Sequence, residues 1–296
     1  MRIRKKYLFY TIAIISSFIA AFVTSVDSYI TREFGNASFS SWSFAFSLFL
    51  VGIIATLIIS LLLSLPYHGK SIGSVIIDPS FTRLRLITKS ELKYQSIAGL
   101  MNAMNTIGYV ILISLVFDPS VLLSFSQIVI LYLLAMESFT EKNIPTLAEV
   151  QSSVIVTFGA ILASISLQGE INLSSLALVF LLINPTWALF SIFQRKLKLM
   201  KIKNTVNDSI NIRFWNVVFS CVFTGLIIVI WDAFTGSRYF IEGLLASVHF
   251  FPLLFLTMGT TFFSYVLYIR SLGLGNASIN NAIRSSTIGS RSAGAT

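Results

Sequence analysis

Charged residues are scarce in this chain, and their scarcity excludes most soluble folds. Lys, Arg, Asp and Glu make up 11% of the 296 residues, whereas hydrophobic residues make up 55%. A soluble domain needs roughly 25% charged residues to cover its surface. The mean hydropathy is +0.83, and the apolar residues fall in runs of about 18 or more, the length that crosses a bilayer. The composition therefore predicts an all-α membrane protein, a polytopic helical bundle.

Metal ligands and thiols are also scarce. The single cysteine, Cys221, lies in an apolar run and has no partner for an intramolecular disulfide. The two histidines, His68 and His249, have no ligand spacing with it, which argues against a structural zinc site. No Gly-x-x-x-x-Gly-Lys-Ser/Thr phosphate-binding loop occurs. We therefore predict no metal site, no cofactor, no ATP hydrolysis and no catalytic residues.

Eight hydrophobic segments have lengths suited to crossing a membrane, and a ninth begins near Ala277. They lie at about 7–26, 41–65, 94–117, 120–136, 150–167, 173–193, 214–231 and 244–269. Most of the 21 Lys and Arg residues fall in every second connection, at 2–6, 68–93, 137–149, 195–213 and 270. Because Lys and Arg are enriched on the cytoplasmic side, we predict a multi-pass protein of the cytoplasmic (cell) membrane with its N-terminus inside.

Acidic residues are absent from the centres of the predicted spans. All twelve Asp and Glu residues fall in connections or near span ends, and those nearest the hydrocarbon are Asp27, Glu137, Glu149 and Asp232. Charges inside a membrane mark proton relays and ion paths. Their absence argues against a proton pump, a voltage sensor and an antiporter built on a carboxylate at the membrane centre.

Two stretches of the sequence are alike. Residues 114–120 end one predicted span and open the next after almost no loop, and residues 271–277 do the same in the second half. A span with aromatic and small polar residues precedes each. The first stretch is entered from the cytoplasm and the second from outside, which predicts inverted repeats with a site at their interface.

These motifs make the sequence resemble the drug/metabolite transporter superfamily, specifically its EamA-like members. The resemblance is carried by the turn at 115–120, by Glu-Lys-Asn-Ile-Pro at 141–145, by Gly159, and by residues 264–272 followed by Asn-Ala-Ser-Ile at 276–279. It covers most of the chain and implies ten spans in two inverted halves of five. Here the halves are residues 1–168 and 169–296.

The C-terminus departs from that family pattern. Arg284 interrupts the ninth apolar segment, and the sequence from Gly289 onward is small and polar. Eight such residues have neither the apolar length nor the helix propensity to cross hydrocarbon. We therefore expect the second repeat to be truncated after span eight or nine, with the first eight spans forming the bundle.

The resemblance implies a secondary transporter that moves small metabolites, such as amino acids or other polar organic solutes, by alternating access. Uncharged polar groups in hydrocarbon are costly unless they meet another helix, a water or a ligand. Pro185, at mid-span, is expected to break its helix and free a carbonyl group. The predicted substrate-binding residues are Asn102, Asn105, Tyr109, Gln127, Asn184, Trp187, Asn216, Thr257, Thr260 and Tyr265. Hydrogen bonding between helices is the alternative role for each of them.

Two other functions stay open. One is a non-transporting assembly or receptor subunit, which would show a stable protein partner. The other is a membrane-embedded enzyme acting on lipid, for which Glu137, Glu141 and Glu149 are the only candidate acid–base groups. We expect a small-molecule solute and the lipid bilayer as partners, and no nucleic acid, because the basic clusters are explained by membrane topology.

Overall fold

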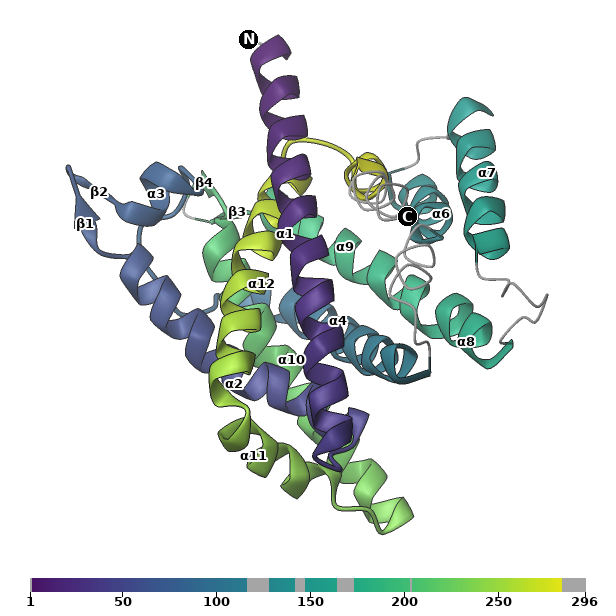
Figure 1. Cartoon of the computed structure of the whole chain (residues 1–296). Coiled ribbons are helices and arrows are strands. Elements are labelled where there is room, and N and C mark those ends of the chain that lie inside the picture. Colours follow the sequence, from purple (N-terminus) through teal and green to yellow (C-terminus); the bar gives the residue numbers. More distant parts are fainter. Residues whose placement is uncertain (1, 116–127, 142–146, 164–172, 203, 284–296) are drawn as a thin grey trace.

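The chain is almost entirely helical in a computed structural model that describes residues 2–115, 128–141, 147–163, 173–202 and 204–283 (Figure 1). The helices are α1 (Arg2–Asn36), α2 (Ser41–Leu63), α3 (Ile72–Ile76), α4 (Lys89–Leu115), α6 (Val129–Glu141), α7 (Leu147–Ala163), α8 (Leu173–Leu178), the π-helix η1 (Val179–Ile183), α9 (Asn184–Leu199), α10 (Ser209–Thr235), α11 (Tyr239–His249) and α12 (Phe251–Leu272). A further helix begins at Ala277, as expected. Two antiparallel hairpins pair β1 (Pro66–Tyr67) with β2 (Lys70–Ser71) and β3 (Lys201–Ile202) with β4 (Thr205–Val206).

Six helices within the described ranges are long and apolar enough to cross a membrane. They are Lys5–Asn36, Ser41–Leu63, Lys89–Leu115, Leu173–Leu199, Ser209–Thr235 and Phe251–Leu272. The prediction of an all-α, multi-pass membrane protein is confirmed at this level. The fourth and fifth predicted spans, 120–136 and 150–167, overlap in part with α6 and α7, which have 13 and 17 residues. The turn at 115–120 falls mostly outside the described residues, as do Glu-Lys-Asn-Ile-Pro after Glu141 and the tail from Arg284.

The prediction of one span at 244–269 is wrong. The chain forms two helices there, α11 and α12, which meet at Phe250. Pro252 lies in the first turn of α12, where a proline ring fits because the N–H that it lacks would have had no partner inside the helix. The proline was a signal for a helix start, and the apolar run around it concealed that signal.

The expectation that acidic residues stay near span ends is wrong for Asp27. α1 continues past Asp27 to Asn36, and the carboxylate is 8% exposed. Thr257 of α12 donates a hydrogen bond from Oγ1 to Asp27 Oδ1 at 2.7 Å. The apolar run stops at Val26, but the helix continues, and the hydroxyls of Ser28 and Thr31 donate to backbone carbonyls of their own helix.

One end of the bundle carries both hairpins, and we call it the hairpin end. Ser80, in the loop after α3, donates a hydrogen bond to the carbonyl of Asn207 beside β4, so the two loops meet. Arg270, near the end of α12, donates to the carbonyl of Ile77 in the same region. α1 packs antiparallel to α12. Consequently α1, α4 and α10 begin at the hairpin end, whereas α2, α9 and α12 finish there (Figure 1).

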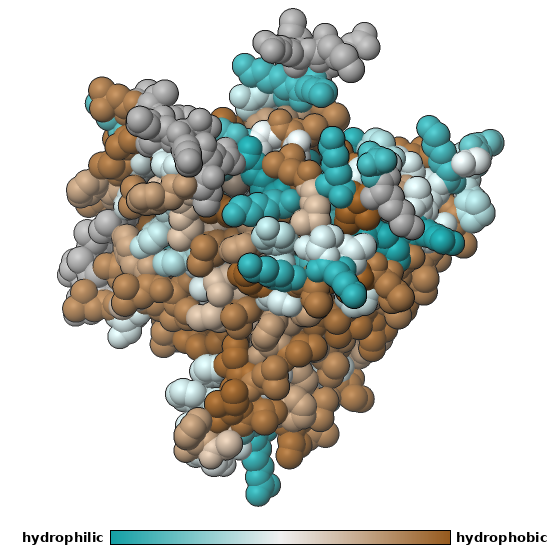
Figure 2. All heavy atoms as spheres, turned by 180° about the vertical axis from the view of Figure 1, so that it is seen from behind, coloured by the Kyte–Doolittle hydropathy of each residue, from teal (hydrophilic) through white to brown (hydrophobic). Residues whose placement is uncertain are grey.

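The outside of the bundle is apolar along the bodies of the helices. Large hydrophobic side chains face outward on several of the long helices, among them Phe18, Phe22, Ile54, Leu61, Leu62, Val222, Leu226 and Ile230. Figure 2 shows the apolar surface of one face, with hydrophilic side chains gathered toward one end. Apolar patches of this extent suit contact with lipid rather than water.

α4 and α10 lie close together where they cross at Gly99. A Cβ atom at Gly99 of α4 would lie 2.4 Å from Phe219 Cβ and 3.1 Å from the carbonyl carbon of Phe219 in α10. Ser220 Oγ also donates to the carbonyl of Gly99 at 3.3 Å. Small residues allow membrane helices to approach this closely. The close approach brings the polar side chains of α4 and α10 within hydrogen-bonding distance of each other.

Candidate functional site

A group of polar side chains joins α4, α10 and α12, and we call it the central polar cluster; four of its members are buried and Tyr265 is half-buried. It consists of Asn102, Arg213, Asn216, Ser220 and Tyr265. Asn102 Nδ2 donates to Ser220 Oγ at 2.8 Å and to Asn216 Oδ1 at 3.3 Å. Arg213 Nη1 donates to the same Asn216 oxygen at 3.2 Å, and its guanidinium lies over the ring of Tyr265, 4.0 Å from the ring centroid. Three predicted site residues therefore meet in one place.

An aromatic group extends the central polar cluster toward α9. The ring of Trp187 contacts the ring of Tyr265 edge-on, with their centroids 5.8 Å apart. Trp187 Nε1 donates to Asn281 Oδ1 at 3.0 Å, and Asn281 Nδ2 donates to the hydroxyl of Tyr268 at 2.9 Å. That hydroxyl donates in turn to Ser191 Oγ at 2.6 Å. A chain of polar contacts thus runs from α4 through α10 and α12 to α9 and the segment after Ala277.

The predicted helix break near Pro185 takes the form of the π-helix η1. The N–H of Asn184 bonds to the carbonyl of Val179, five residues back, which widens the turn. Side chains from two other helices donate hydrogen bonds to the carbonyl groups of this segment. Asn105 Nδ2 donates to the carbonyl of Ile183, and the hydroxyl of Tyr132 donates to that of Phe180, each at 2.8 Å. The widened turn therefore leaves carbonyl groups that can accept hydrogen bonds, and side chains of the protein itself donate to them.

Several predicted site residues lie apart from the central polar cluster. Tyr109 packs among apolar side chains beside α2 and η1, and Asn184 is buried at the start of α9. Thr257 is bonded to Asp27 on α1. Thr260 is partly exposed and returns its hydroxyl hydrogen to the carbonyl of Leu256 in its own helix. Gln127 lies outside the described residues.

The sequence interpretation missed Arg213, which it assigned to a cytoplasmic connection. The residue lies in α10 and is only 2% exposed. A signal was present, because Arg213, Asn216, Ser220 and Thr224 recur at the helical spacing of three or four residues and all four are buried. The contribution of Asn281 had no such signal, since it depends on the fold of the chain after α12.

Buried side-chain amides of α4, α9 and α10 also have polar atoms with no hydrogen-bond partner in the described part of the chain. They are Asn216 Nδ2, Gln95 Oε1 and both side-chain polar atoms of Gln194. Gln95 Nε2 donates to the carbonyl of Ile212, the residue before Arg213. Buried polar atoms are normally bonded to protein or water. Such atoms inside an apolar bundle are available to a bound molecule.

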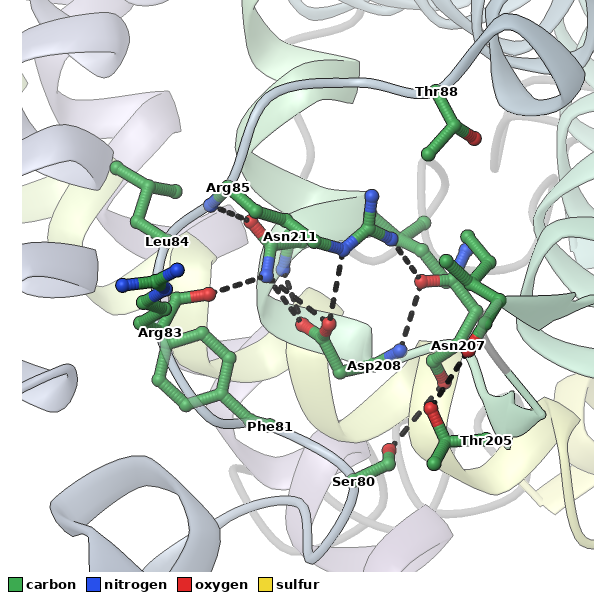
Figure 3. A network of polar contacts seen from close by, with 12 residues as sticks. Ser80, Phe81, Arg83, Leu84, Arg85, Thr88, Thr205, Asn207, Asp208 and Asn211 are labelled. Atoms are coloured by element: carbon green, nitrogen blue, oxygen red, sulfur yellow. Dashed lines mark hydrogen bonds and ion pairs between the residues drawn. The ribbon is translucent and has the colours of Figure 1, made fainter.

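A second polar network links the loops at the hairpin end (Figure 3). Arg85 donates to both oxygens of Glu91, at 2.7 and 2.8 Å, and to Asn207 Oδ1 at 2.8 Å. Asp208 begins α10 and accepts the backbone N–H of Asn211 at 2.7 Å, which is the usual N-cap bond. The side-chain amide of Asn211 donates back to Asp208 and to a carbonyl of the loop before α4. Residues from both halves of the sequence therefore hold this end together.

The centre of the second network is an ion pair between Lys198 and Asp78. Lys198 Nζ lies 2.6 Å from Asp78 Oδ2, and the two residues are 5% and 3% exposed. Burial alone would raise the pKa of the Asp78 carboxyl. The ammonium of Lys198 and hydrogen bonds from Lys198, Ser209 and Ser80 outweigh it and hold that pKa well below its usual range. Asp78 is therefore a charged, fully bonded group.

Asp208 shows the opposite balance of the same forces. Burial raises the pKa of its carboxyl above the usual value, although hydrogen bonds from Asn211 and the charge of Arg85 oppose the rise. Asp78 lies near enough to add to the repulsion. The second network therefore stabilises the anionic form of Asp78, whereas burial disfavours the anionic form of Asp208.

No protein-family model, curated protein or solved structure matches this chain. Among the described residues, no group of three or more His, Cys, Asp and Glu could hold a metal ion. The central polar cluster contains amide, hydroxyl, guanidinium and aromatic groups, which can form hydrogen bonds, carry charge and stack.

Glu137, one of the three carboxylates considered for an enzyme, makes contacts that suit a structural role. Its two oxygens accept the backbone N–H groups of Ala277, at 2.7 Å, and Ser278, at 3.4 Å. Arg195 Nη1 lies 3.5 Å from Glu137 Oε1. The carboxylate thus caps the helix that begins at Ala277 and neutralises a cation of α9. The side chains of Glu141 and Glu149 lie outside the described part of the structure.

Proposed function

We propose that this chain is a secondary transporter, similar to EamA-like proteins, that moves small polar organic solutes across the cytoplasmic membrane. Its solutes would be amino acids or related metabolites. The observation that carries the proposal is the central polar cluster, which is buried among helices that are otherwise apolar. Burying amide and guanidinium groups in such a bundle is costly, and a solute that uses them offsets that cost.

The packing of the helices supports the inverted repeat that alternating access requires. If α1, α2 and α4 correspond to α9, α10 and α12, the main contacts among these six helices form matching pairs. α1 packs on α12 as α9 packs on α4, and α2 packs on α12 as α10 packs on α4. α2 and α10, which would be each other's equivalents, pack together.

The directions of these helices fit the same correspondence. α1 and α4 begin at the hairpin end, whereas their proposed equivalents α9 and α12 finish there. α2 finishes at the hairpin end, and its proposed equivalent α10 begins there. Each helix is therefore antiparallel to its equivalent, as expected for repeats related by an axis in the membrane plane.

The hairpin end is the one that we assign to the cytoplasm. Basic residues gather there, including Lys70, Arg83, Arg85, Lys89, Lys93, Lys196, Lys198 and Lys201. Enrichment in Lys and Arg is typical of cytoplasmic connections. With this orientation, the network of Asp78, Arg85, Lys198 and Asp208 joins the proposed halves at the cytoplasmic side. These contacts would have to open for a solute to pass there.

Flux through proteoliposomes tests the proposed function. We expect saturable uptake of at least one solute from a panel of radiolabelled amino acids and small organic acids. Replacing Asn102 and Asn105 together by leucine should reduce uptake at least about tenfold, because each amide hydrogen bond inside the bundle contributes about 1 kcal/mol or more. The loss should exceed any loss of folded protein in size-exclusion chromatography.

Thr260→Val is the matched control for that double variant. Its hydroxyl bonds only to its own helix in the described structure, so uptake should stay within about twofold of the unmodified chain. Uptake that survives the double asparagine change would contradict the assignment of the central polar cluster as the solute site. Absence of saturable uptake for the whole panel would contradict the transporter proposal.

A further inference from the structure

A carboxyl group lies inside the bundle, between α1 and α12. Asp27 belongs to a buried stripe of α1 whose other members are apolar: Ala20, Val23, Ile30 and Phe34. These residues recur every three or four positions, so they share one face of the helix, and α1 packs mainly on α12. Thr257, which bonds to Asp27, lies about 9 Å along α12 from the start of that helix at Phe251. The carboxyl group is therefore within the contact between two membrane-spanning helices.

This carboxyl group has few polar partners. Thr257 Oγ1 donates to Asp27 Oδ1 at 2.7 Å, and Asp27 Oδ2 receives no hydrogen bond from the described residues. Asp78 at the hairpin end, by contrast, is bonded to the ammonium of Lys198 and to two hydroxyl groups. A carboxylate buried in apolar surroundings is costly unless a cation or several hydrogen bonds compensate its charge. Asp27 lacks that compensation within the described part of the chain.

The helices that pack on α1 present no cation to Asp27. α2 contains no charged side chain, and α12 contains one, Arg270, about 20 Å along the helix axis beyond Thr257. The charged residues of α4 lie in its first two turns, at the hairpin end: Lys89, Glu91 and Lys93. The other ionisable groups of α4 and α12 are phenols, which carry no positive charge: Tyr94, Tyr109, Tyr265 and Tyr268.

The charged residues of α1 that follow Asp27 point away from it. Arg32 and Glu33 lie five and six positions further along the helix and therefore on other faces. His249 of α11 contacts the ring of Phe39, beyond the end of α1. Among the described residues, Asp27 is therefore a buried acid with one hydroxyl partner and no counter-ion.

We propose that Asp27 binds and releases one proton in each transport cycle, so that the proton is the coupling ion of the transporter. This inference rests on the proposed transport function. Binding forms an O–H bond at Oδ2 and removes one negative charge, which suits the packed arrangement of α1 and α12. Release leaves a carboxylate, which favours a conformation in which the two helices separate and water reaches Asp27. α12 also carries Tyr265 of the central polar cluster, two turns beyond Thr257, so its movement links the two sites.

A proton is favoured over a metal cation because of the number of oxygen atoms at the site. Hard metal cations take several oxygen ligands, whereas a carboxyl group needs no further ligand to bind a proton. The nearest hydroxyl groups along α1 donate to backbone carbonyls of their own helix: Thr24, Ser28 and Thr31. Thr257 alone among the described side chains bonds to the carboxyl group of Asp27.

Infrared difference spectroscopy of the purified full-length chain in detergent tests the proton site without requiring flux. A protonated carboxyl group has a carbonyl stretching band that shifts in deuterium oxide. One such band should titrate with pH separately from those of exposed carboxyl groups, and it should be missing in Asp27→Asn. This substitution is nearly the same size and keeps an oxygen that can accept from Thr257, so it preserves the contact with α12 while removing the titration.

Flux measurements distinguish coupling from packing. In proteoliposomes with a clamped membrane potential, a pH difference of about one unit should change the initial rate of uptake at least about threefold. Asp27→Asn cannot release a proton, so its uptake should not respond to the pH difference. Thr257→Val loses the hydrogen bond but keeps the titratable group, and its uptake should still respond. Ser264→Ala, which removes a bond to the carbonyl of Ser16 at the same helix contact, should respond like the unmodified chain.

The outcomes separate the proton site from the transporter proposal. A response to the pH difference that survives in Asp27→Asn, or an infrared spectrum that this variant leaves unchanged, would overturn the proton site. Uptake by the unmodified chain that ignores the pH difference, or that a sodium gradient drives instead, would overturn it and leave transport standing; this result needs no variant to fold. A titrating Asp27 band in a chain without saturable uptake would support the proton site and count against transport.

Discussion

Replacing Asp78 by asparagine is expected to lower the free energy of unfolding by about 3–5 kcal/mol, the usual cost of leaving one member of a buried ion pair without its partner. In this variant Lys198 Nζ would keep its hydrogen bonds to the carbonyl of Asn207, at 2.7 Å, and to the hydroxyl of Ser80, at 3.3 Å. It would lose the charged carboxylate oxygen of Asp78, which lies 2.6 Å away in the unmodified chain. Equilibrium unfolding in mixed detergent micelles measures the loss. A change of less than about 1 kcal/mol would mean that the pair is solvated rather than buried.

The double variant Asp78→Asn with Lys198→Met is the control for this cycle. Removing both charges leaves no uncompensated ion, so the double variant should be more stable than Asp78→Asn alone. Lys70→Met, at an exposed position in β2, should change stability by less than about 0.5 kcal/mol. A double variant that is less stable than the single one would contradict the interpretation of the pair as electrostatic.

The Asp78 pair also predicts a pH dependence. Its carboxyl has a lower pKa in the folded chain than in the unfolded chain, where an aspartate titrates near about 3.9. The unfolded chain therefore takes up a proton first as the pH falls, and stability contributed by Asp78 is complete above about pH 5 and declines below about pH 4. Asp78→Asn should lose this part of the acid dependence, while Lys70→Met should keep it.

Gly99→Ala is expected to destabilise the bundle by about 1–3 kcal/mol, as overpacking of a close interface does. The new methyl group would lie 2.4 Å from Phe219 Cβ and 3.1 Å from a backbone atom, so α4 and α10 must move apart. The gain in helix propensity from glycine to alanine, about 1 kcal/mol, acts in the opposite direction and does not relieve a backbone clash. Because Asn102 and Ser220 meet beside this crossing, solute binding should weaken as well.

Two other glycines serve as controls for that change. At Gly52, the nearest atom to an added Cβ is the terminal methyl of Met258, at 2.3 Å, a flexible end that can rotate away. Gly52→Ala should therefore cost less than Gly99→Ala. At Gly159 nothing lies within 4 Å, so alanine should be neutral or stabilising. Equal effects at all three positions would show that helix propensity, rather than the α4–α10 contact, governs stability.

The helical fold could be predicted because its main signal is local. Long apolar runs and alternating basic connections mark the spans without knowledge of their neighbours. The errors in the predicted helix boundaries arose where local signals in the sequence conflicted. The apolar run at 244–269 hid the helix start at Pro252, and the polar residues after Val26 concealed the continuation of α1 around Asp27.

The candidate site could be predicted only in part, because it depends on how helices cross. Polar residues within apolar runs identified Asn102, Asn216, Trp187 and Tyr265, which the fold brings to one place. Arg213 was misplaced, since a cation after a basic loop is normally cytoplasmic, and only tertiary packing shows it stacked on Tyr265. Thr260 lies five residues before Tyr265 and so on another face of α12, where its hydroxyl bonds to its own helix.

The contacts of Glu137 impose an order on assembly in the membrane. Spans are made from the N-terminus onward, so Glu137 of α6 is inserted well before the backbone N–H groups of Ala277 and Ser278 that it accepts. Arg195, made between them, lies 3.5 Å from the same carboxylate. Arg195 can neutralise the charge of Glu137 until Ala277 and Ser278 have been made, which lowers the free-energy cost of keeping the carboxylate in the membrane. A chain with Arg195→Leu should therefore stall during biogenesis, leaving a species whose α6 is accessible to membrane proteases.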